Sequence, residues 1–163
     1  MIGPNGMNRF RRSFVAVAAA AVCAATAAAA QAQEGGVYVA GDGVGFAKAA
    51  SQALSANPSG QRFFLLVLPP ETRALKANAA GQLAATGKRV TSSGGVLMVC
   101  RRDVDSGKVD LGALVPGVVV VRGWPPSGST ALPPGERYFA GEDRNVLPAS
   151  NEGLRRLRTT CSD

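Results

Sequence analysis

The residues best suited to chemistry stand at the carboxyl end of a predicted strand. Cys100 ends the apolar run of residues 96–100, and Arg101 and Arg102 follow it directly. Basic neighbours and a helix N-terminus stabilise a thiolate relative to a thiol, which makes a cysteine nucleophilic. Cys100 is therefore the candidate catalytic residue, acting in thiol exchange or as a persulfide carrier. Arg101 and Arg102 are candidate residues of a pocket wall beside it.

Cys161 offers a different role for the same cysteine. It follows a helix predicted over residues 151–160, in which Leu154, Leu157 and Cys161 share one face at spacings i, i+3 and i+7. Cys161 is therefore expected to face the core or the sheet edge, and two cysteines in an exported domain usually pair. Three possibilities stay open for Cys100: a disulfide with Cys161, a buried core thiol and a reactive thiol. The basic side chains of this helix are predicted to point elsewhere: Arg155, Arg156 and Arg158.

A glycine-rich turn joins the first predicted strand to the first predicted helix. Gly41, Gly43 and Gly45 are spaced G-x-G-x-G, and Asp42 places a negative charge inside the turn. The dinucleotide fingerprint is G-x-G-x-x-G, and a carboxylate there repels a pyrophosphate. The glycines are therefore predicted to allow positive φ angles in a tight corner rather than to bind phosphate. Open α/β sheets build sites at this end of their strands, so Gly41, Asp42 and Gly43 are also candidate pocket-wall residues.

Other side chains offer little further chemistry. The chain has no histidine, which removes the commonest general base and the commonest metal ligand. Asp103, Asp105 and Asp110 lack the glycine and glutamate of a calcium-binding loop. Basic residues are scattered and do not alternate with aromatic residues, so no nucleic-acid partner is expected. No metal or cofactor is expected, and the single tryptophan, Trp124, is predicted to pack over the end of the sheet.

Four short apolar runs predict the strands that position these residues: 37–40, 63–68, 96–100 and 118–121. Continuous apolar runs indicate strands of a parallel sheet that are buried on both faces. One apolar stripe at helical spacing predicts a helix after the first strand: Phe46, Ala49, Ala50, Ala53 and Leu54. The order of elements predicts a single three-layer α/β domain, with a mostly parallel four- to five-stranded sheet and helices on both faces.

The connections carry weaker patterns. A second helix is expected after Pro69-Pro70, with Glu71 in its first turn and Gly87 at its C-terminal cap. Its apolar stripe consists of Leu75, Ala79 and Leu83. Residues 101–115 predict a short helix followed by a turn.

The last part of the chain contains three expected elements. Residues 124–135 are rich in proline and predict a loop. Residues 137–140 predict a short edge strand. Ser150 is the expected N-cap of the C-terminal helix, within residues 150–161.

Residues 1–32 have the pattern of a secretory signal peptide. A basic start is followed by an uncharged, alanine-rich stretch and by the cleavage pattern Ala30-Gln31-Ala32. Arg11 and Arg12 also resemble a twin-arginine export motif. Alanine is only weakly apolar, so no stable membrane anchor is expected after cleavage. The mature domain, residues 33–163, is therefore predicted to be periplasmic or secreted, where disulfides can form.

Residues 94–124 resemble the DsrE/DsrF-like sulfur-relay family; they read GGVLMVCRRDVDSGKVDLGALVPGVVVVRGW. That family has a strand ending in a cysteine, then a polar helix, then the pattern L-x-P-G-V-x-V-V. The matching residues are Cys100, Leu114, Pro116, Gly117, Val118, Val120 and Val121. The resemblance implies a DsrE-like fold for residues 33–163 and a persulfide-carrying role for Cys100. Asp103 and the two arginines before it depart from the small or amide residues that usually follow the family's cysteine.

Two functional hypotheses follow from these patterns. The first is an exported α/β domain with sulfur- or thiol-linked binding or transfer through Cys100. The second is a non-enzymatic envelope protein, in which a Cys100–Cys161 disulfide is structural and an end or edge of the sheet binds a partner protein. Another protein or a second copy of this chain is the expected partner. The number of free thiols separates the two hypotheses.

Overall fold

The computed structural model describes residues 36–58, 60–126, 132 and 136–162. The predicted signal peptide and part of the predicted loop at 124–135 lie outside these residues. In chain order the described elements are β1 (Val37–Ala40), α2 (Phe46–Ala56), β2 (Phe63–Val67), η2 (Glu71–Leu75), α3 (Gly81–Ser92), β3 (Gly95–Cys100), α4 (Arg101–Asp105), η3 (Leu111–Ala113), β4 (Val119–Val121), η4 (Arg144–Val146) and α5 (Asn151–Thr160). No helix in this part of the chain is long and apolar enough to cross a membrane.

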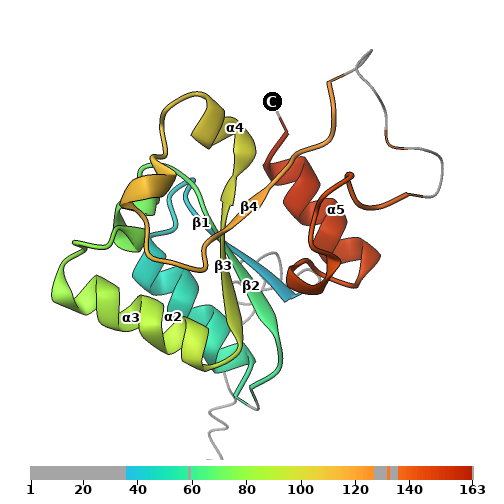
Figure 1. Cartoon of the computed structure of the whole chain (residues 1–163). Coiled ribbons are helices and arrows are strands. Elements are labelled where there is room, and N and C mark those ends of the chain that lie inside the picture. The colour runs from blue at the N-terminus through green and yellow to red at the C-terminus, as the bar shows by residue number, and fades with distance from the viewer. Residues whose placement is uncertain (1–35, 59, 127–131, 133–135, 163) are drawn as a thin grey trace, which may run out of the picture.

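The strands form one parallel sheet in the order β1-β2-β3-β4 (Figure 1). Leu65 in β2 pairs with Tyr38 of β1 on one side and with Leu97 of β3 on the other, and Val99 of β3 pairs with Val120 of β4. Each strand therefore neighbours the next one along the chain, and helical segments make the crossovers. The predicted α/β domain with a parallel sheet is confirmed.

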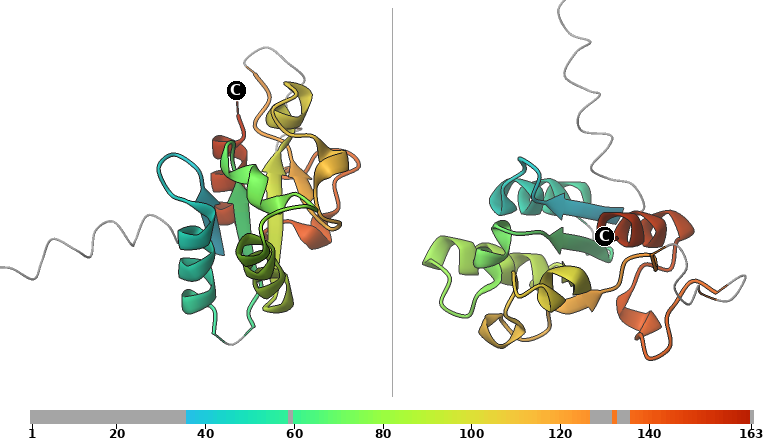
Figure 2. Two further views of the ribbon diagram at one scale, coloured as in Figure 1. Left: turned by 90° about the vertical axis from the view of Figure 1, so that its left-hand side faces the viewer. Right: turned by 90° about the horizontal axis from the view of Figure 1, so that it is seen from above.

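Helices cover both faces of the sheet (Figure 2). On one face α2 and α3 pack against alternate residues of β2, among them Phe63 and Leu65. On the other face α5 packs against the residues between them, Phe64 and Leu66. Successive side chains of a strand point to opposite faces, so β2 is buried along its whole length. The three-layer arrangement follows from this double burial.

The second predicted helix is wrong as a single element. The structure forms the short 3₁₀ helix η2, then an extended stretch, and then α3. The N–H of Ala77 donates to the carbonyl of Ala113 at 2.9 Å, and the N–H of Val115 donates to the carbonyl of Leu75 at 2.8 Å. These long-range bonds occupy backbone groups that a continuous helix would bond internally. The break therefore comes from residues far away in the sequence.

Helix α3 also ends later than predicted. Gly87, the expected cap, lies inside α3 and has open space beyond its own helix. The helix continues to Ser92, which brings Val90 into the core. A side chain at Gly95, the first residue of β3, would clash with Phe63 and Val90. Packing at this junction sets where α3 gives way to β3.

The edge strand predicted at residues 137–140 does not form. The guanidinium of Arg158 donates to the carbonyl of Arg137 at 3.1 Å, and the N–H of Phe139 donates to the Glu142 carboxylate at 3.0 Å. Side chains thus bind the backbone groups that a strand would use for pairing. The sheet ends at β4, which is only partly buried and not enclosed on both faces as predicted.

The glycine-rich turn after β1 is a tight corner, as predicted. The φ angle is 133° at Gly41, 50° at Asp42 and 88° at Gly43. Gly41 and Val44 exchange two backbone hydrogen bonds of 2.8 and 2.9 Å, which close the corner. At Gly41 and Gly43, glycine reaches these angles without the steric cost that a side chain adds. Gly45 has a φ of −66° and is the N-cap of α2, so the predicted positive φ holds at two of the three glycines.

Candidate functional site

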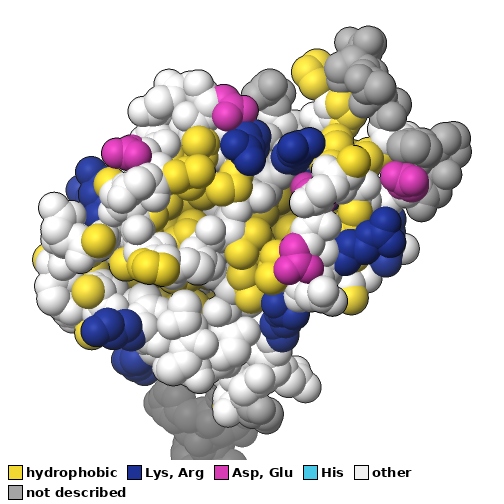
Figure 3. All heavy atoms as spheres, viewed as in Figure 1, with side chains coloured by type: hydrophobic (Ala, Val, Ile, Leu, Met, Phe, Trp, Pro, Cys, Tyr) yellow, Lys and Arg dark blue, Asp and Glu magenta, His cyan; other side chains and the backbone are white. Residues whose placement is uncertain are grey.

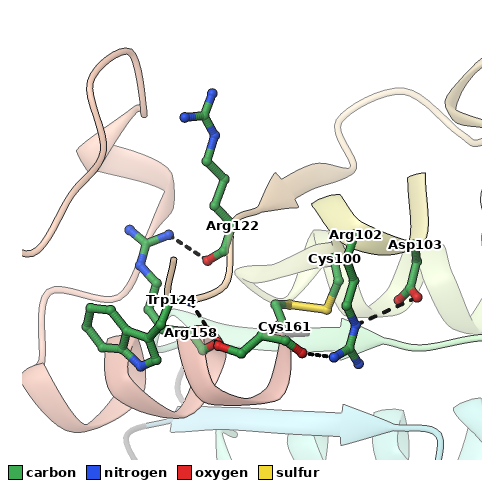
Figure 4. The surroundings of a disulfide bond; sticks show 8 residues. Cys100, Arg102, Asp103, Arg122, Trp124, Arg158 and Cys161 are labelled. Atoms are coloured by element: carbon green, nitrogen blue, oxygen red, sulfur yellow. Dashed lines mark hydrogen bonds and ion pairs between the residues drawn. A yellow bond between two sulfur atoms is a disulfide. The ribbon is translucent and has the colours of Figure 1, made fainter. Parts of the chain in front are cut away.

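Cys100 and Cys161 form a disulfide that joins the end of β3 to the end of α5 (Figure 4). Their Cα atoms are 5.1 Å apart, a distance that a disulfide spans without backbone movement. Both side chains lie in the core on the α5 face of the sheet, and Cys100 is 0% exposed. Cys161 therefore faces inward, on the apolar side of its helix.

The bond changes what Cys100 can do. The nucleophile in cysteine chemistry is the thiolate, and disulfide-bonded cysteines do not titrate. Arg102 is also not available to stabilise a thiolate at Cys100. Its guanidinium donates to the carbonyl of Ser162 and lies 3.8 Å from the Asp103 carboxylate. In this state the chemistry of the site is that of the surface groups around the bond.

The disulfide-bonded end of α5 is locked to the chain that leaves β4. The backbone N–H of Trp124 donates to the Oγ of Ser162 at 2.9 Å, and this Oγ donates to the carbonyl of Arg158 at 2.8 Å. Gly123 lies so close to the backbone of Cys161 that a side chain at this position would clash. The position of Trp124 therefore depends on where the disulfide holds the end of α5.

A hollow of about 340 Å³ lies beside the disulfide. Arg101 and Arg102 line it, as expected of pocket-wall residues, and Cys161 forms part of the wall. Trp124 was predicted to pack over the sheet end, but it is 39% exposed and also lines the hollow. The remaining lining residues are Asp105, Arg122, Gly123, Pro125, Pro126 and Phe139. The hollow therefore combines basic, aromatic and proline surfaces.

A second hollow, of about 190 Å³, adjoins the first and shares Arg101 and Arg122 with it. Its other lining residues come from β4 and from the segment around η4: Val119, Val120, Gly141, Glu142, Asp143, Val146 and Leu147. We call the two hollows together the trough. It runs from the outer edge of β4, past the two arginines, to Trp124.

Basic residues outnumber exposed acidic residues in the trough: Arg101, Arg102 and Arg122 line it, as do two exposed carboxylates, Asp105 and Asp143. Arg101 has one carboxylate partner, Asp105 at 3.8 Å, and both side chains are exposed, so the pair is weak. Among the described residues Arg122 forms no ion pair, and its guanidinium lies 5.5 Å from the centre of the Phe139 ring. Figure 4 shows its side chain extending away from the disulfide. Arg101 and Arg122 can therefore receive an anionic group.

Arg158 is buried, although the charged residues of this helix were predicted to point away from the core. It is 0% exposed, and its guanidinium donates to both carboxylate oxygens of Glu142, to one of them at 2.7 Å. It also donates to the carbonyl of Arg122 at 2.8 Å and lies 4.7 Å from the centre of the Phe139 ring. One signal for this position was present in the sequence: Arg158 follows Leu154 by four residues, which places it on the apolar side of α5.

The candidate wall residues of the glycine turn, Gly41, Asp42 and Gly43, are not part of the trough. Strand β2 lies between β1 and β3, so the turn and Cys100 belong to separate stretches of the same sheet end. The two sets of candidate wall residues therefore lie apart at the same end of the sheet.

The start of α2, where an anion could bind after the glycine turn, already has a carboxylate. The N–H of Phe46 donates to the Glu71 side chain at 2.8 Å. A negative charge at this position satisfies a free N–H and favours the helix dipole. Glu71 lies in the first turn of η2, as predicted, and in addition its carboxylate caps α2.

No group of side chains within the described ranges could hold a metal ion. Comparisons with protein families, with curated proteins and with solved structures found no match to this chain. The disulfide and the trough are therefore the features of the molecule that indicate its function.

Proposed function

We propose that this protein is an exported, non-enzymatic binding domain, in which the Cys100–Cys161 disulfide is a structural bond and the trough is the ligand site. The observation that carries the proposal is the contrast between the two features. The sulfur atoms are buried and bonded to each other, whereas the arginines and the tryptophan beside them face an open hollow. Arginine and tryptophan are the side chains that contribute most to binding at protein interfaces.

Export is part of the same proposal. The pattern of residues 1–32 is that of a cleaved signal, and both cysteines that remain after cleavage are accounted for by one disulfide. Such bonds persist in oxidising compartments and are rare in the cytosol. Protein isolated from the cell envelope should begin near Gln33 or Glu34. Full-length protein retained in the membrane would contradict this part of the proposal.

Incubation with a low-molecular-weight persulfide, followed by intact-protein mass spectrometry, tests whether Cys100 carries sulfur. The mature protein with its disulfide intact should gain no sulfur, because persulfide transfer needs an accessible thiolate. The Cys100→Ser/Cys161→Ser double variant is the control for sulfur bound elsewhere, because Cys100→Ser alone would leave Cys161 as a free thiol that can itself accept sulfur. Gain of one sulfur atom that the variant lacks would contradict the binding-domain proposal and would favour sulfur relay.

The second candidate function is thiol chemistry at Cys100, in line with the DsrE/DsrF-like resemblance. It is supported by the position of Cys100, at the carboxyl end of β3 and directly before α4, with two arginines next in sequence. A dithiol partner would have to open the disulfide first, and the partner would itself become a disulfide. The experiment is brief treatment with a dithiol and then alkylation. Selective labelling of Cys100 in folded protein would favour this candidate.

A further inference from the structure

The outer side of β4 is an open strand edge. Strand β4 is last in the sheet order and pairs only with β3. Among the described residues, no backbone hydrogen bond beyond this pairing involves Val119, Val120 or Val121. An unpaired strand edge presents a row of N–H and C=O groups to which another extended chain can bond.

The second hollow lies along this edge. Val119 belongs to the core cluster on the α5 face, and Val120 belongs to the cluster on the α2–α3 face. A hollow lined by both residues must therefore lie at the edge, where the two faces meet. Figure 3 views this side of the molecule and shows apolar side chains across its middle, with basic side chains above them.

The charges of the trough define what fits it. The two carboxylates of the second hollow differ: Glu142 is paired with Arg158, whereas Asp143 is exposed, accepts among the described residues only from the N–H of Asn145 at 2.9 Å and keeps its negative charge. The shared residues Arg101 and Arg122 lack a strong partner of this kind. An extended chain on β4 would thus meet apolar surface with one exposed carboxylate, Asp143, and then the two arginines, whose positive charge exceeds it.

We infer that the trough binds an extended, acidic peptide segment of another protein, which adds as a strand to the outer edge of β4 and places a carboxylate at Arg101 and Arg122. The inference rests on the proposed binding function and names its ligand class. Backbone hydrogen bonds to the edge supply affinity, alternate side chains contact the valines, and the arginines select for the acidic residue. Trp124 forms the far wall of the trough beyond the arginines.

A second copy of this chain is a poorer occupant by charge. Pairing of two β4 edges would bring Arg101 and Arg122 from both copies to the interface, and the one exposed carboxylate of each second hollow, Asp143, does not balance them. Like charges at an interface cost affinity. The chain before β1 is no better matched, because its signal segment is basic.

The test is binding of a fluorescent, end-blocked peptide, Thr-Val-Thr-Val-Asp, measured by anisotropy on the mature protein. One analogue replaces its Asp by Asn, and another carries N-methyl groups on alternate residues. The protein variants are Arg122→Gln and the matched control Arg89→Gln, which removes an exposed arginine from α3. Circular dichroism melting confirms that both variants are folded.

We expect the parent peptide to bind, and the Asn analogue and Arg122→Gln each to weaken binding about tenfold. Their combination should weaken binding little further, because both changes remove the same contact. Arg89→Gln should have no effect. The N-methylated analogue should not bind, because N-methyl groups remove donors needed at a strand edge.

Four outcomes would overturn the inference. Equal binding of the N-methylated analogue would rule out strand addition, and equal binding to Arg122→Gln would rule out the arginine contact. A concentration-dependent dimer that excludes the peptide would assign the edge to a second copy. The fourth outcome is that the peptide does not bind at all. Counting the free thiols of the same sample then shows whether the ligand class alone or also the proposed function is wrong. Absent peptide binding with an intact disulfide rejects the ligand class alone, whereas free, reactive Cys100 rejects the binding-domain proposal.

Discussion

The backbone N–H of Trp124 donates a hydrogen bond of 2.9 Å to the Oγ of Ser162, the residue directly after disulfide-bonded Cys161. One wall of the trough is therefore attached to the end of α5, and the end of α5 is attached to β3 through Cys100. The disulfide therefore helps to hold one wall of the proposed ligand site in position. A buried bond with no accessible thiol can in this way still determine the shape of a binding surface.

Opening the disulfide should change the environment of Trp124, the only tryptophan of the chain. Once the end of α5 is released, Ser162 no longer holds the Trp124 backbone, and the indole becomes more exposed to water. We expect the tryptophan emission to shift to longer wavelength when a strong reductant is added. The doubly substituted Cys100→Ser/Cys161→Ser protein is the control, and its emission should not respond. Identical spectra of the native protein before and after reduction would contradict the coupling.

Loss of the disulfide should also lower the free energy of unfolding. The two cysteines are 61 residues apart in sequence, and chain-entropy models assign a loop of that size about 4 kcal/mol. Cys100→Ser and Cys161→Ser should destabilise the protein by similar amounts, and the double variant should lose little more than either single variant. Urea unfolding with and without reductant measures this. Additive losses in the two single variants would show that the cysteines act independently.

Removal of the Arg158 guanidinium should be among the most destabilising single changes. Arg158→Ala leaves the nearly buried Glu142 carboxylate without its partner and releases the carbonyls of Arg122 and Arg137. Loss of one member of a buried ion pair costs about 3–5 kcal/mol. Arg89→Ala on the exposed side of α3 is the control, and it should change the unfolding free energy by less than about 0.5 kcal/mol. Similar unfolding midpoints for the two variants would show that the pair contributes little.

Val99 and Val120 provide a direct test of which strands are central. They are register partners, but Val99 is 0% exposed whereas Val120 lies on the edge strand and is half-buried. Val99→Asp should unfold the domain, because a charge would enter the core without a partner. Val120→Asp should remain folded with a loss of about 1–2 kcal/mol. Circular dichroism of the two variants distinguishes them, and an unfolded Val120→Asp protein would mean that the edge of β4 is covered.

The sequence predicts the sheet well because a strand that is buried on both faces is a continuous run of apolar residues. The run at β2 is continuously apolar and is buried at every position, as the pattern indicates. The run at β4 looks the same in sequence but is only partly buried, because no strand forms after it in the described part of the chain. Whether a strand is central or at an edge depends on which segment lies beside it. At residues 137–140 that outcome is set by the distant side chain of Arg158.

The parts of the site that could not be predicted all depend on long-range partners. Arg158 lies on the apolar side of α5, but only the position of Glu142 explains how a guanidinium can be buried there. Glu71 caps α2 at Phe46, which precedes it by 25 residues. Neither partner is marked by local spacing. The cysteines left several roles open for the same reason, since a pair is visible in a sequence but its geometry is not.

The measurement that tests the central claim most directly is alkylation of the purified mature protein without reductant, read by mass spectrometry of its peptides. A structural disulfide predicts no label on Cys100 or Cys161 in the native or the denatured protein, and full label on both after denaturation with reductant. Rapid labelling of Cys100 in the native, unreduced protein would contradict the claim. Cys100 would then be a reactive thiol, and sulfur chemistry would become the better explanation of the site.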